Sequence, residues 1–471
     1  MAENRTTSRE LIVDVDGRTE SSRQARLQGA LRDAVRSGRL AAGSRLPSSR
    51  ALAADLGVSR GVVVEAYDQL IAEGYLHSRQ GSGTVVADGA ARPANDASSP
   101  QIAPPTAAWR VDFEPGRPDL DGFPRSMWTS AIRSALAELT AADLDYGDPL
   151  GDPVLRAELA AYLGRVRGAA VEPERVHVVG GVGQGLGLLA RTRRAGGDTT
   201  VFVEDPGAYV LRGVVETAGL PVEPVPVDHA GMIVDRLPAT GERQTVLVSP
   251  AHQYPMGAVL APERRAVLVD WARSGIGRLV VEDDYDAEFR YDRSPIGCIQ
   301  GLAPEHVALT GSVSKSLAPG LRIGWLVLPE RWSGPVGERQ LWEHLQPPIV
   351  DQRAFAHLLA SGRYDRHIRR ARARSRERRD ALLEQLGRIA DVEIHGVSAG
   401  LQVVATLPIG TDVAAITAAT AEARVQVRSL DDYRVRPAEP PGVVLAFAHL
   451  TVDEIRVGVA VVAEAIARQL G

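Results

Sequence analysis

Short apolar runs alternate with longer helical patterns through most of this sequence, from Val111 to the C-terminus. That alternation predicts the strands of a mostly parallel sheet, buried between helices. Because ligands in such α/β folds bind at the carboxyl ends of the strands, we expect functional residues to follow the runs directly. The predicted strands are Val176–Val179, Val201–Val203, Thr245–Val248, Leu279–Val281 and Val307–Leu309.

A single lysine, Lys315, stands among the 54 lysine and arginine residues. Lysine can lose its proton and form a Schiff base with a carbonyl, whereas arginine stays charged and non-nucleophilic. Lys315 could simply have escaped a compositional bias toward arginine. Its setting, GSVSKSLAPGLR, places serines before it and an arginine seven residues after it, which favours a chemical role.

The segment that follows Leu279–Val281 reads EDDYDAEFRY, and its acids allow three interpretations. They could form a solvated turn, or they could bind a hard metal ion in a metal-dependent hydrolase. They could also supply a carboxylate that holds a proton on a pyridine nitrogen, beside a tyrosine hydroxyl. Only the third interpretation also explains Lys315, as the Schiff-base lysine of a pyridoxal phosphate site.

A glycine run, GGVGQGLG, follows Val176–Val179 and enters a helical pattern. Backbone N–H groups at a helix start, unobstructed by side chains, bind phosphate. Tight packing of the helix against the strand is an equally good explanation of the glycines. The run lacks the Gly-Lys-Ser/Thr ending of a nucleotide P-loop, and no acidic residue sits at the usual ribose spacing, so by itself it does not identify a nucleotide site.

The front of the chain predicts three short helices and a hairpin. Apolar residues at helical spacing indicate a first helix that ends near Gly38. Ser48-Ser49 can cap a second helix that ends at Gly57, and Ser59 can cap a third that ends at Gly74. Two helices joined by a short glycine-containing turn form a helix-turn-helix, and the strands expected on either side of residues 80–83 form a wing.

Helix-turn-helix geometry points the start of the third helix at base edges, and the second helix at phosphates or base edges. Residues 21–87 carry nine arginines against five acidic residues, which favours binding to double-stranded operator DNA over a plain packing module. The wing glycines permit close approach of the backbone. The candidate DNA-contacting residues are Arg45, Ser48, Ser49, Arg50, Ser59, Arg60, Gly61, Gln80, Gly81 and Gly83.

The composition divides the chain into a DNA-binding domain over 20–88, a linker over 89–108 and a large domain over 109–471. The linker is rich in proline, alanine and serine, which predicts an extended, semi-rigid spacer long enough to reach a neighbouring subunit. The single cysteine, Cys298, excludes an internal disulfide framework. No run approaches the length of a membrane span, so we expect a cytoplasmic protein without a membrane partner.

Two resemblances extend this interpretation. The stretch GRLAAGSRLPSSRALAADLGVSRGVVVEAYDQLIAEGYLHSRQGSGTVV resembles the winged helix of the GntR superfamily of bacterial repressors. Residues 109–471 resemble fold-type I aminotransferases, and the motifs LDYGDPLGDPVLRAELAAYL, SPAHQYPMG, EDDYDAEFRY and GSVSKSLAPGLRIGW resemble the MocR/GabR branch, in which both domains are fused. The implied fold class is α/β: a winged helix-turn-helix, a large domain with a mostly parallel sheet, and a small C-terminal α+β domain.

The resemblance also implies roles for individual residues. Lys315 would form the Schiff base with pyridoxal phosphate, Asp283 would pair with the pyridine nitrogen, and Tyr285 would lie near the phenolic oxygen. Tyr146 would reach the phosphate from the other subunit of a homodimer. His252 and Tyr254 fall in the segment that lines the ring, without an assigned role. The phosphate itself would be bound by Ser312, Ser314, Arg322 and the backbone of Val182 and Gly183.

The chain departs from the family pattern at several places, among them Val62, where the winged-helix family commonly has threonine, and a glycine run richer than the usual glutamine pair. The family often reads Glu-Asp-Pro-Gly-Tyr, with a tyrosine that stacks on the ring, whereas this chain reads EDPGAY, which places Tyr209 one residue late. Near the C-terminus, GVVLAFAHLT lacks the arginine with which enzymatic aminotransferases hold a substrate carboxylate. Arg428 is the candidate substitute for binding an effector carboxylate.

We therefore expect a regulator that senses pyridoxal phosphate, or a small amine or amino acid, through a Schiff base at Lys315. It would act as a homodimer whose winged helices could be exchanged between subunits. An active aminotransferase with a fused DNA-binding domain is the alternative, against which the missing arginine weighs. Residues 363–379 hold nine arginines, which predict either a second DNA contact or, as we favour, a solvated helix between the large and small domains.

Overall fold

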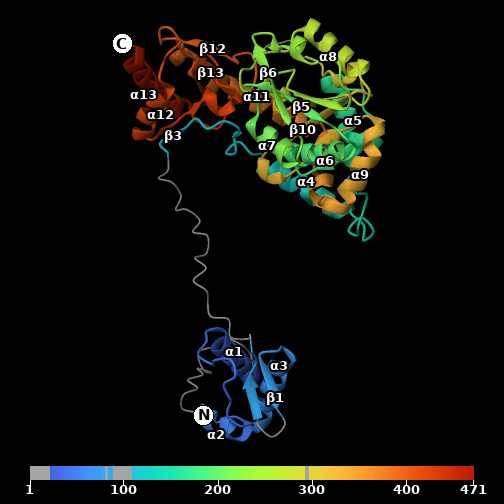
Figure 1. The fold of residues 1–471 in the computed structure, drawn as a ribbon, viewed down its shortest axis with the longest axis vertical. Coiled ribbons are helices and arrows are strands. Elements are labelled where there is room, and N and C mark those ends of the chain that lie inside the picture. The colour runs from blue at the N-terminus through green and yellow to red at the C-terminus, as the bar shows by residue number, and fades with distance from the viewer. Residues whose placement is uncertain (1–21, 80–82, 89–108, 292–295, 471) are drawn as a thin grey trace. The chain divides into compact units, whose positions relative to one another are not determined.

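The computed structural model describes residues 22–79, 83–88, 109–291 and 296–470, which form two compact units that divide between Thr106 and Ala107 (Figure 1). The predicted linker, residues 89–108, lies outside the described residues, as do Gln80 and Gly81 of the wing. Each unit has its own hydrophobic core.

The N-terminal unit is a winged helix-turn-helix, as the sequence predicted. Ser22 and Ser48 begin its first two helices by accepting hydrogen bonds from backbone N–H groups, and Gly57, in the left-handed region, ends the second. Apolar side chains of the three helices share one core with the two antiparallel strands. The elements are α1 Arg23–Arg36, α2 Ser49–Leu56, α3 Arg60–Ala72, β1 Leu76–Arg79 and β2 Gly83–Val86.

The C-terminal unit contains an eight-stranded sheet in the order β4-β11-β10-β9-β8-β5-β6-β7. All five runs predicted as strands are strands of this sheet, and their mutual pairings are parallel. The sheet is mixed because β11 runs antiparallel to both of its neighbours, and β7 antiparallel to β6. The strands are β4 Val176–Val179, β5 Thr200–Asp205, β6 Val222–Asp228, β7 Gly231–Met232, β8 Gln244–Val248, β9 Leu279–Asp283, β10 Val307–Ser312 and β11 Gly324–Val327.

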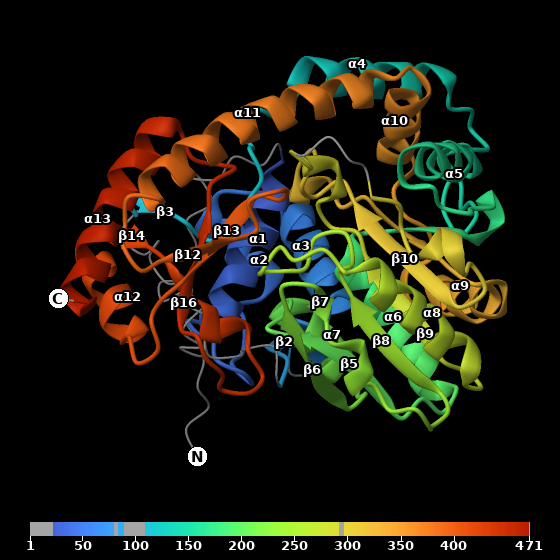
Figure 2. The same cartoon turned by 90° about the horizontal axis from the view of Figure 1, so that it is seen from above.

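Helices cover both faces of this sheet, which explains why its central strands are apolar without alternation (Figures 1 and 2). Ala308 and Leu309, adjacent on β10, belong to opposite cores, one packed by α6 and α7 and the other by α4, α5 and α10. The helices are α4 Arg125–Glu138, α5 Pro153–Arg167, α6 Val182–Ala195, α7 Tyr209–Thr217, α8 Pro262–Ser274, α9 Glu330–His344 and α10 Ile349–Ala360.

A small α+β domain follows, also as predicted. Its antiparallel sheet has the order β12-β13-β16-β15, and β14 pairs in parallel with β3 from the start of the unit. The helix α11 runs from the large domain into this small domain (Figure 2). The elements are β3 Val111–Asp112, α11 Arg363–Leu386, β12 Glu393–His395, β13 Gln402–Thr406, α12 Val413–Glu422, β14 Val425–Gln426, β15 Arg428–Ser429, β16 Gly442–Ala446 and α13 Val452–Leu470.

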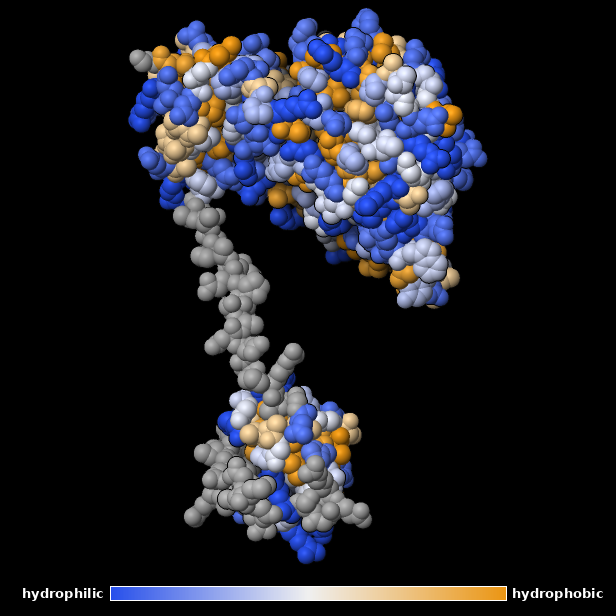
Figure 3. Space-filling view, in the orientation of Figure 1, coloured by the Kyte–Doolittle hydropathy of each residue, from blue (hydrophilic) through white to orange (hydrophobic). Residues whose placement is uncertain are grey.

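Six short 3-10 helices connect these elements in the described ranges: η1 Pro173–Arg175, η2 Val234–Arg236, η3 Ala287–Phe289, η4 Gln300–Leu302, η5 Pro319–Leu321 and η6 Leu430–Tyr433. On the visible face of the C-terminal unit, apolar residues are interspersed among hydrophilic ones (Figure 3). No helix among the described residues is long and apolar enough to cross a membrane. Asp283 and Ser312 lie at the carboxyl ends of β9 and β10, the edge of the sheet at which α/β folds bind ligands.

Candidate functional site

Lys315 lies in the loop between β10 and β11, where its Nζ donates a hydrogen bond to the carbonyl oxygen of Gly116 (2.6 Å). Burial lowers the pKa of Lys315, although the nearby carboxylates of Asp283 and Asp286 oppose this effect. A lowered pKa brings the amine closer to the neutral form, which is the nucleophile in Schiff-base formation. The surroundings of this lysine therefore suit the chemistry that its rarity suggested.

Asp283 ends β9 and is 5% exposed. The hydroxyl of Thr310, directly opposite on β10, donates a hydrogen bond to Asp283 Oδ1 (3.2 Å). Burial raises the pKa of Asp283 to about 7, and the neighbouring acids Asp284 and Asp286 act in the same direction. A cationic group bound beside Asp283 would stabilise its ionised form, so a protonated pyridine nitrogen is a suitable partner.

The hydroxyl of Tyr285 lies in a side-chain network, 2.8 Å from His252 Nδ1, and accepts a hydrogen bond from Gln402 Nε2 (3.1 Å). His252 Nδ1 is also 2.8 Å from Asp286 Oδ2. Burial, followed by Asp286, raises the pKa of Tyr285, so this hydroxyl keeps its proton. Tyr285 can therefore donate to a phenolic oxygen, and His252 acquires a positioning role that the sequence left unassigned. Tyr254 packs edge-on against Tyr285 (5.5 Å between ring centroids).

The start of α6 lies beside the side chain of Arg322. Gly181 precedes the helix with φ of 110° and has no capping side chain. A Cβ on Gly181 would lie 3.1 Å from the Arg322 guanidinium, which forms no hydrogen bond or ion pair with another described residue. Free backbone N–H groups at a helix start, with an unpaired guanidinium beside them, suit a phosphate.

Other predicted phosphate ligands lie on neighbouring segments. Ser312 pairs with Gly324 across β10 and β11, and its Oγ accepts a hydrogen bond from the N–H of Ser314 (3.3 Å). At Gly183, in the first turn of α6, an added Cβ would meet only Val214, at 3.9 Å, so its backbone is accessible. A lysine amine, a buried acid, a tyrosine hydroxyl and a phosphate cradle together fit the functional groups of pyridoxal phosphate.

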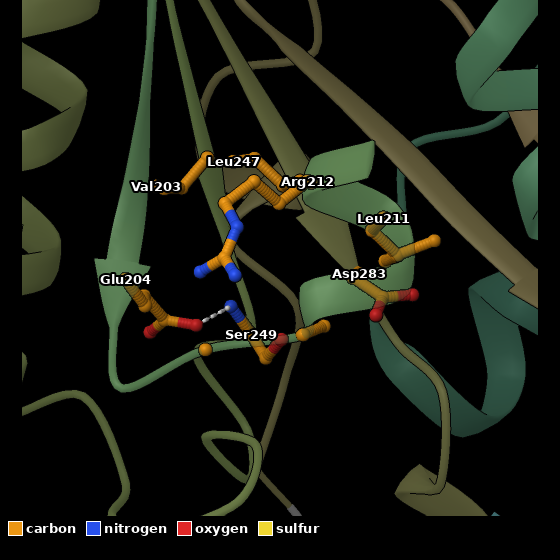
Figure 4. A pocket seen from close by; sticks show the side chains of 9 residues that line it. Val203, Glu204, Leu211, Arg212, Leu247, Ser249 and Asp283 are labelled. Atoms are coloured by element: carbon orange, nitrogen blue, oxygen red, sulfur yellow. Dashed lines mark hydrogen bonds between the residues drawn. The ribbon is translucent and has the colours of Figure 1, made fainter. Parts of the chain in front are cut away.

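A pocket beside Asp283 contains residues that sequence reasoning missed (Figure 4). Glu204 ends the buried part of β5, accepts a hydrogen bond from the N–H of Ser249 (3.1 Å), and has its pKa raised to about 8 by burial. The Arg212 side chain extends toward Glu204 and Ser249. Glu204 lies at the carboxyl end of β5, and Ser249 directly follows β8. Because ligands bind at this edge of an α/β sheet, these positions could have identified both residues from the sequence.

The one-residue displacement of Tyr209 has a structural consequence. Ala208, rather than Tyr209, lines the pocket beside Asp283. Tyr209 begins α7, is 39% exposed, and packs edge-on against Tyr433 (5.6 Å between ring centroids). The loop therefore presents a methyl group where the family often has an aromatic ring.

Arg428 is paired with a carboxylate. Its Nε donates a hydrogen bond to Glu114 Oε2 (2.7 Å), and Gln426 Nε2 donates to the same oxygen (2.7 Å). Asp432 lies 3.8 Å from the Arg428 guanidinium. An effector carboxylate would have to compete with Glu114 for Arg428.

Tyr146 is 81% exposed and lines a surface groove with Leu341 and Leu345. Its hydroxyl forms no hydrogen bond with another described residue, and in particular none with Ser312, Ser314 or Arg322 of its own chain. Its exposure leaves the ring available to a second subunit.

The acids of EDDYDAEFRY have separate protein partners. Asp284 forms a two-pronged ion pair with Arg167 (2.7 Å for each hydrogen bond), and Asp286 contacts His252. Across the described part of the chain, no three potential ligand side chains come together in a group that could hold a metal ion. The acids of this segment therefore form separate interactions with different side chains and do not converge on one point.

In the N-terminal unit, Ser59, Arg60 and Gly61 are exposed at the start of α3. Ser59 occupies the expected capping position, but its side chain accepts no capping hydrogen bond, so its hydroxyl remains free for a ligand. Ser48 caps α2 through a hydrogen bond from the N–H of Ala51 (3.3 Å), and Arg50 is exposed.

The segment that precedes α2 joins the wing. Arg45 forms an antiparallel bridge with Val85, and its guanidinium lies 3.2 Å from where a Cβ of Gly83 would stand. The structure therefore brings Arg45 and Gly83 together, although they are far apart in the sequence. Ser49 begins α2 beside them in sequence and is half-buried.

Comparison with known proteins supports both units. Residues 23–86 match the family of bacterial regulatory proteins named gntR, and residues 116–462 match aminotransferase class I and II. The chain is 32% identical to the HTH-type pyridoxine biosynthesis transcriptional regulator PdxR of Corynebacterium glutamicum, over 97% of this chain and 99% of that protein. It is 34% identical to the probable rhizopine catabolism regulatory protein MocR of Rhizobium meliloti, over 84% and 83% of the two chains.

Solved structures confirm the predicted fold of the large unit. A multiple substrate aminotransferase from Thermococcus profundus superposes with a TM-score of 0.71 at 24% identity, over 78% of this chain and 93% of that one. An archaeal alanine:glyoxylate aminotransferase superposes with a TM-score of 0.68 at 25% identity, over 76% and 91% of the two chains.

The raised pKa of Glu204 leads us to expect a pH-dependent free energy of unfolding. Its pKa is raised from 4.5 to about 8, so between these values the folded protein retains a proton that the unfolded chain releases, and stability falls as the pH rises. Glu204→Gln mimics the protonated side chain and should remove up to about 1.4 kcal/mol per pH unit of that decline. Chemical denaturation between pH 5 and 8, at about half-unit steps, measures this. Equal slopes for the wild type and the variant would contradict the assignment.

Proposed function

The chain belongs to the gntR family of bacterial regulatory proteins, fused to an aminotransferase class I and II domain in the MocR/GabR-type arrangement, and on this basis we propose that it is a pyridoxal phosphate-dependent transcriptional regulator. The observation that carries the proposal is the position of Lys315 near the buried Asp283, in the same chain as a winged helix. It would act on operator DNA in the cytoplasm.

Residues of this chain would hold the cofactor by its separate functional groups. Arg322, Ser312, Ser314 and the start of α6 would bind the phosphate, and Asp283 would hold a proton on the ring nitrogen. Tyr285, oriented by His252 and Gln402, would donate to the phenolic oxygen. When bound, the cofactor supplies an aldehyde that condenses with the amine of Lys315.

We propose pyridoxal phosphate itself as the sensed ligand in preference to an amino acid. Arg428 is compensated by Glu114, and the segment GVVLAFAHLT offers no second arginine for a carboxylate. Neither Arg428 nor that segment therefore offers an amino acid an unpaired carboxylate partner. The name of the Corynebacterium relative, a regulator of pyridoxine biosynthesis, agrees with this choice.

Sensing would be transmitted through a homodimer. Tyr146 and the groove formed with Leu341 and Leu345 offer exposed surface to a second copy, from which Tyr146 would complete the phosphate site. Ligand binding that favours one arrangement of the two subunits would change how their winged helices meet the two operator half-sites.

The decisive experiment measures affinity for operator DNA with and without pyridoxal phosphate, in the wild type and in Lys315→Ala. We expect the cofactor to change the affinity of the wild type only, because alanine cannot form the Schiff base. Lys315→Arg is a matched control, since it keeps the charge without the nucleophile and should also lose the response. A cofactor effect that persists in both variants would refute the switching role of Lys315.

Arg322→Gln tests the phosphate cradle. Loss of a charged hydrogen bond, which contributes about 1.5–3 kcal/mol, should weaken binding of pyridoxal phosphate roughly tenfold or more. Pyridoxal, which lacks the phosphate, should bind both proteins equally. Absorbance titration of the Schiff base measures both ligands, with Arg456→Gln, at an exposed arginine of α13, as control. An equal loss for both ligands would show that Arg322 does not bind the phosphate.

The aminotransferase alternative is favoured by the fold alone, and the pairing of Arg428 with Glu114 weighs against it. Incubation of the loaded protein with amino donors and keto acids distinguishes the two functions. We expect at most a single half-reaction per site, because Arg428, the candidate partner of a substrate carboxylate, is already paired with Glu114. Multiple turnovers would establish the enzyme.

A further inference from the structure

The outward face of α11 carries three arginines of the run that the sequence interpreted either as a second DNA contact or as a solvated helix: Arg366, Arg369 and Arg370. Their spacing of three and four residues places them on one side of the helix, opposite the buried Tyr364 and Ala371. All three are exposed, and none of their guanidinium groups forms a hydrogen bond or ion pair with another residue in the described ranges. We call them the α11 arginine face.

The other arginines of this run are used within the domain. Arg374 forms an ion pair with Asp119, and Arg378 lies 3.1 Å from the same carboxylate. Others donate to backbone carbonyls, as Arg372 does to Glu288 (2.8 Å). Two acids interrupt the run: Asp365 is bound by Arg165 (2.8 Å) and is therefore already neutralised, whereas Glu377, seven residues after Arg370, is exposed. Six of the nine arginines therefore have partners within the domain, and the side chains of the α11 arginine face are left without an ion pair among the described residues.

A neighbouring helix adds to this charge. Arg363 Nη1 donates to Ser130 Oγ (3.3 Å), which brings α4 beside the N-terminal end of α11 (Figure 2). Arg133, three residues after Ser130, is exposed, and its guanidinium also forms no hydrogen bond or ion pair with any other described residue. Like charges at this spacing repel each other, so their concentration in a chain of net charge −5 calls for an anionic partner.

We propose that the α11 arginine face binds the phosphate backbone of duplex DNA outside the segment contacted by the winged helix. The proposal rests on the proposed function, because it needs a chain that binds DNA. Guanidinium groups on an exposed helix face contact phosphates without reading bases, so the interaction is independent of sequence. Each phosphate neutralised releases a counterion, which makes the contribution sensitive to salt.

The test compares two duplexes bound by the full-length protein. The first is the shortest duplex that the wild type selects from a random-sequence library, and the second is the same duplex extended by about 20 base pairs, or two helical turns, at each end. The variant replaces all three arginines by glutamine (Arg366→Gln, Arg369→Gln and Arg370→Gln).

We expect the wild type to bind the extended duplex more tightly, and the variant to lose that gain while binding the short duplex unchanged. Because the variant would leave three phosphates without a cationic partner, the logarithmic salt slope on the extended duplex should fall by about 2.7, equivalent to about 40-fold in affinity between 50 and 200 mM salt. Replacement of the same three arginines by lysine should preserve the gain, because a phosphate contact needs only the charge.

A matched control removes the same net charge elsewhere. Three exposed arginines that pair with nearby acids serve this purpose. Arg388, just after α11, pairs with Glu384 of that helix, and Arg456 and Arg468 pair with acids of their own helix, α13. Their combined replacement by glutamine should leave the gain from the extended duplex intact. An equal loss in this control would overturn the proposal in favour of a general effect of net charge.

Two further outcomes would also overturn it. One is a glutamine variant that retains the gain and its salt slope. The other is a changed oligomeric state in sedimentation with unchanged DNA affinity, which would assign the face to a second copy of the chain. Because all three side chains are exposed, an unchanged unfolding temperature should accompany the variant. If the wild type selects no duplex at all, the proposed regulatory function fails, and that result is distinguishable from failure of the α11 arginine face.

Discussion

The parallel register between β9 and β10 is the constraint on which the candidate site depends. It sets Asp283 directly opposite Thr310, one strand away from the loop that carries Lys315. Because side chains alternate along a strand, a slip of one residue would turn Asp283 to the other face of the sheet. Continuous burial of both strands between helices prevents that slip, since it would exchange the residues of two separate cores.

The same burial gives the site its electrostatic character. Asp283 and Glu204 are carboxyl groups at the ends of buried strands of one sheet, and burial raises the pKa of each, to about 7 and about 8. Lys315 is affected in the opposite direction, so acid and amine are both shifted toward their neutral forms. A ligand with a cationic ring would stabilise the ionised form of Asp283. Its aldehyde would react with the neutral amine of Lys315, which the lowered pKa favours. By contrast, the charge of Arg428, outside this group of residues, is compensated by its ion pair with Glu114.

The motifs located most of the candidate site because they are local. Lys315 and Arg322 of GSVSKSLAPGLRIGW lie on the loop after β10, and Asp283 of EDDYDAEFRY ends β9; the apolar pattern predicted both of these strands correctly. Contacts between distant residues were not predictable. Glu114 and Arg428 are 314 residues apart, and Gln402 reaches Tyr285 from the small domain. The antiparallel β11, inside a motif treated as one stretch, also appeared only in the structure.

The sequence by itself determined the two units, the winged helix-turn-helix, the α/β sheet, and the candidate for the reactive lysine, because periodicity, capping residues and composition are properties of neighbouring residues. The tertiary structure decided which charges remain uncompensated. It showed Arg428 paired, Arg322 beside a helix start without a partner among the described residues, and the arginines of α11 divided between internal partners and an open face. Whether a charge is paired depends on residues brought together by folding, and no local pattern contains that information.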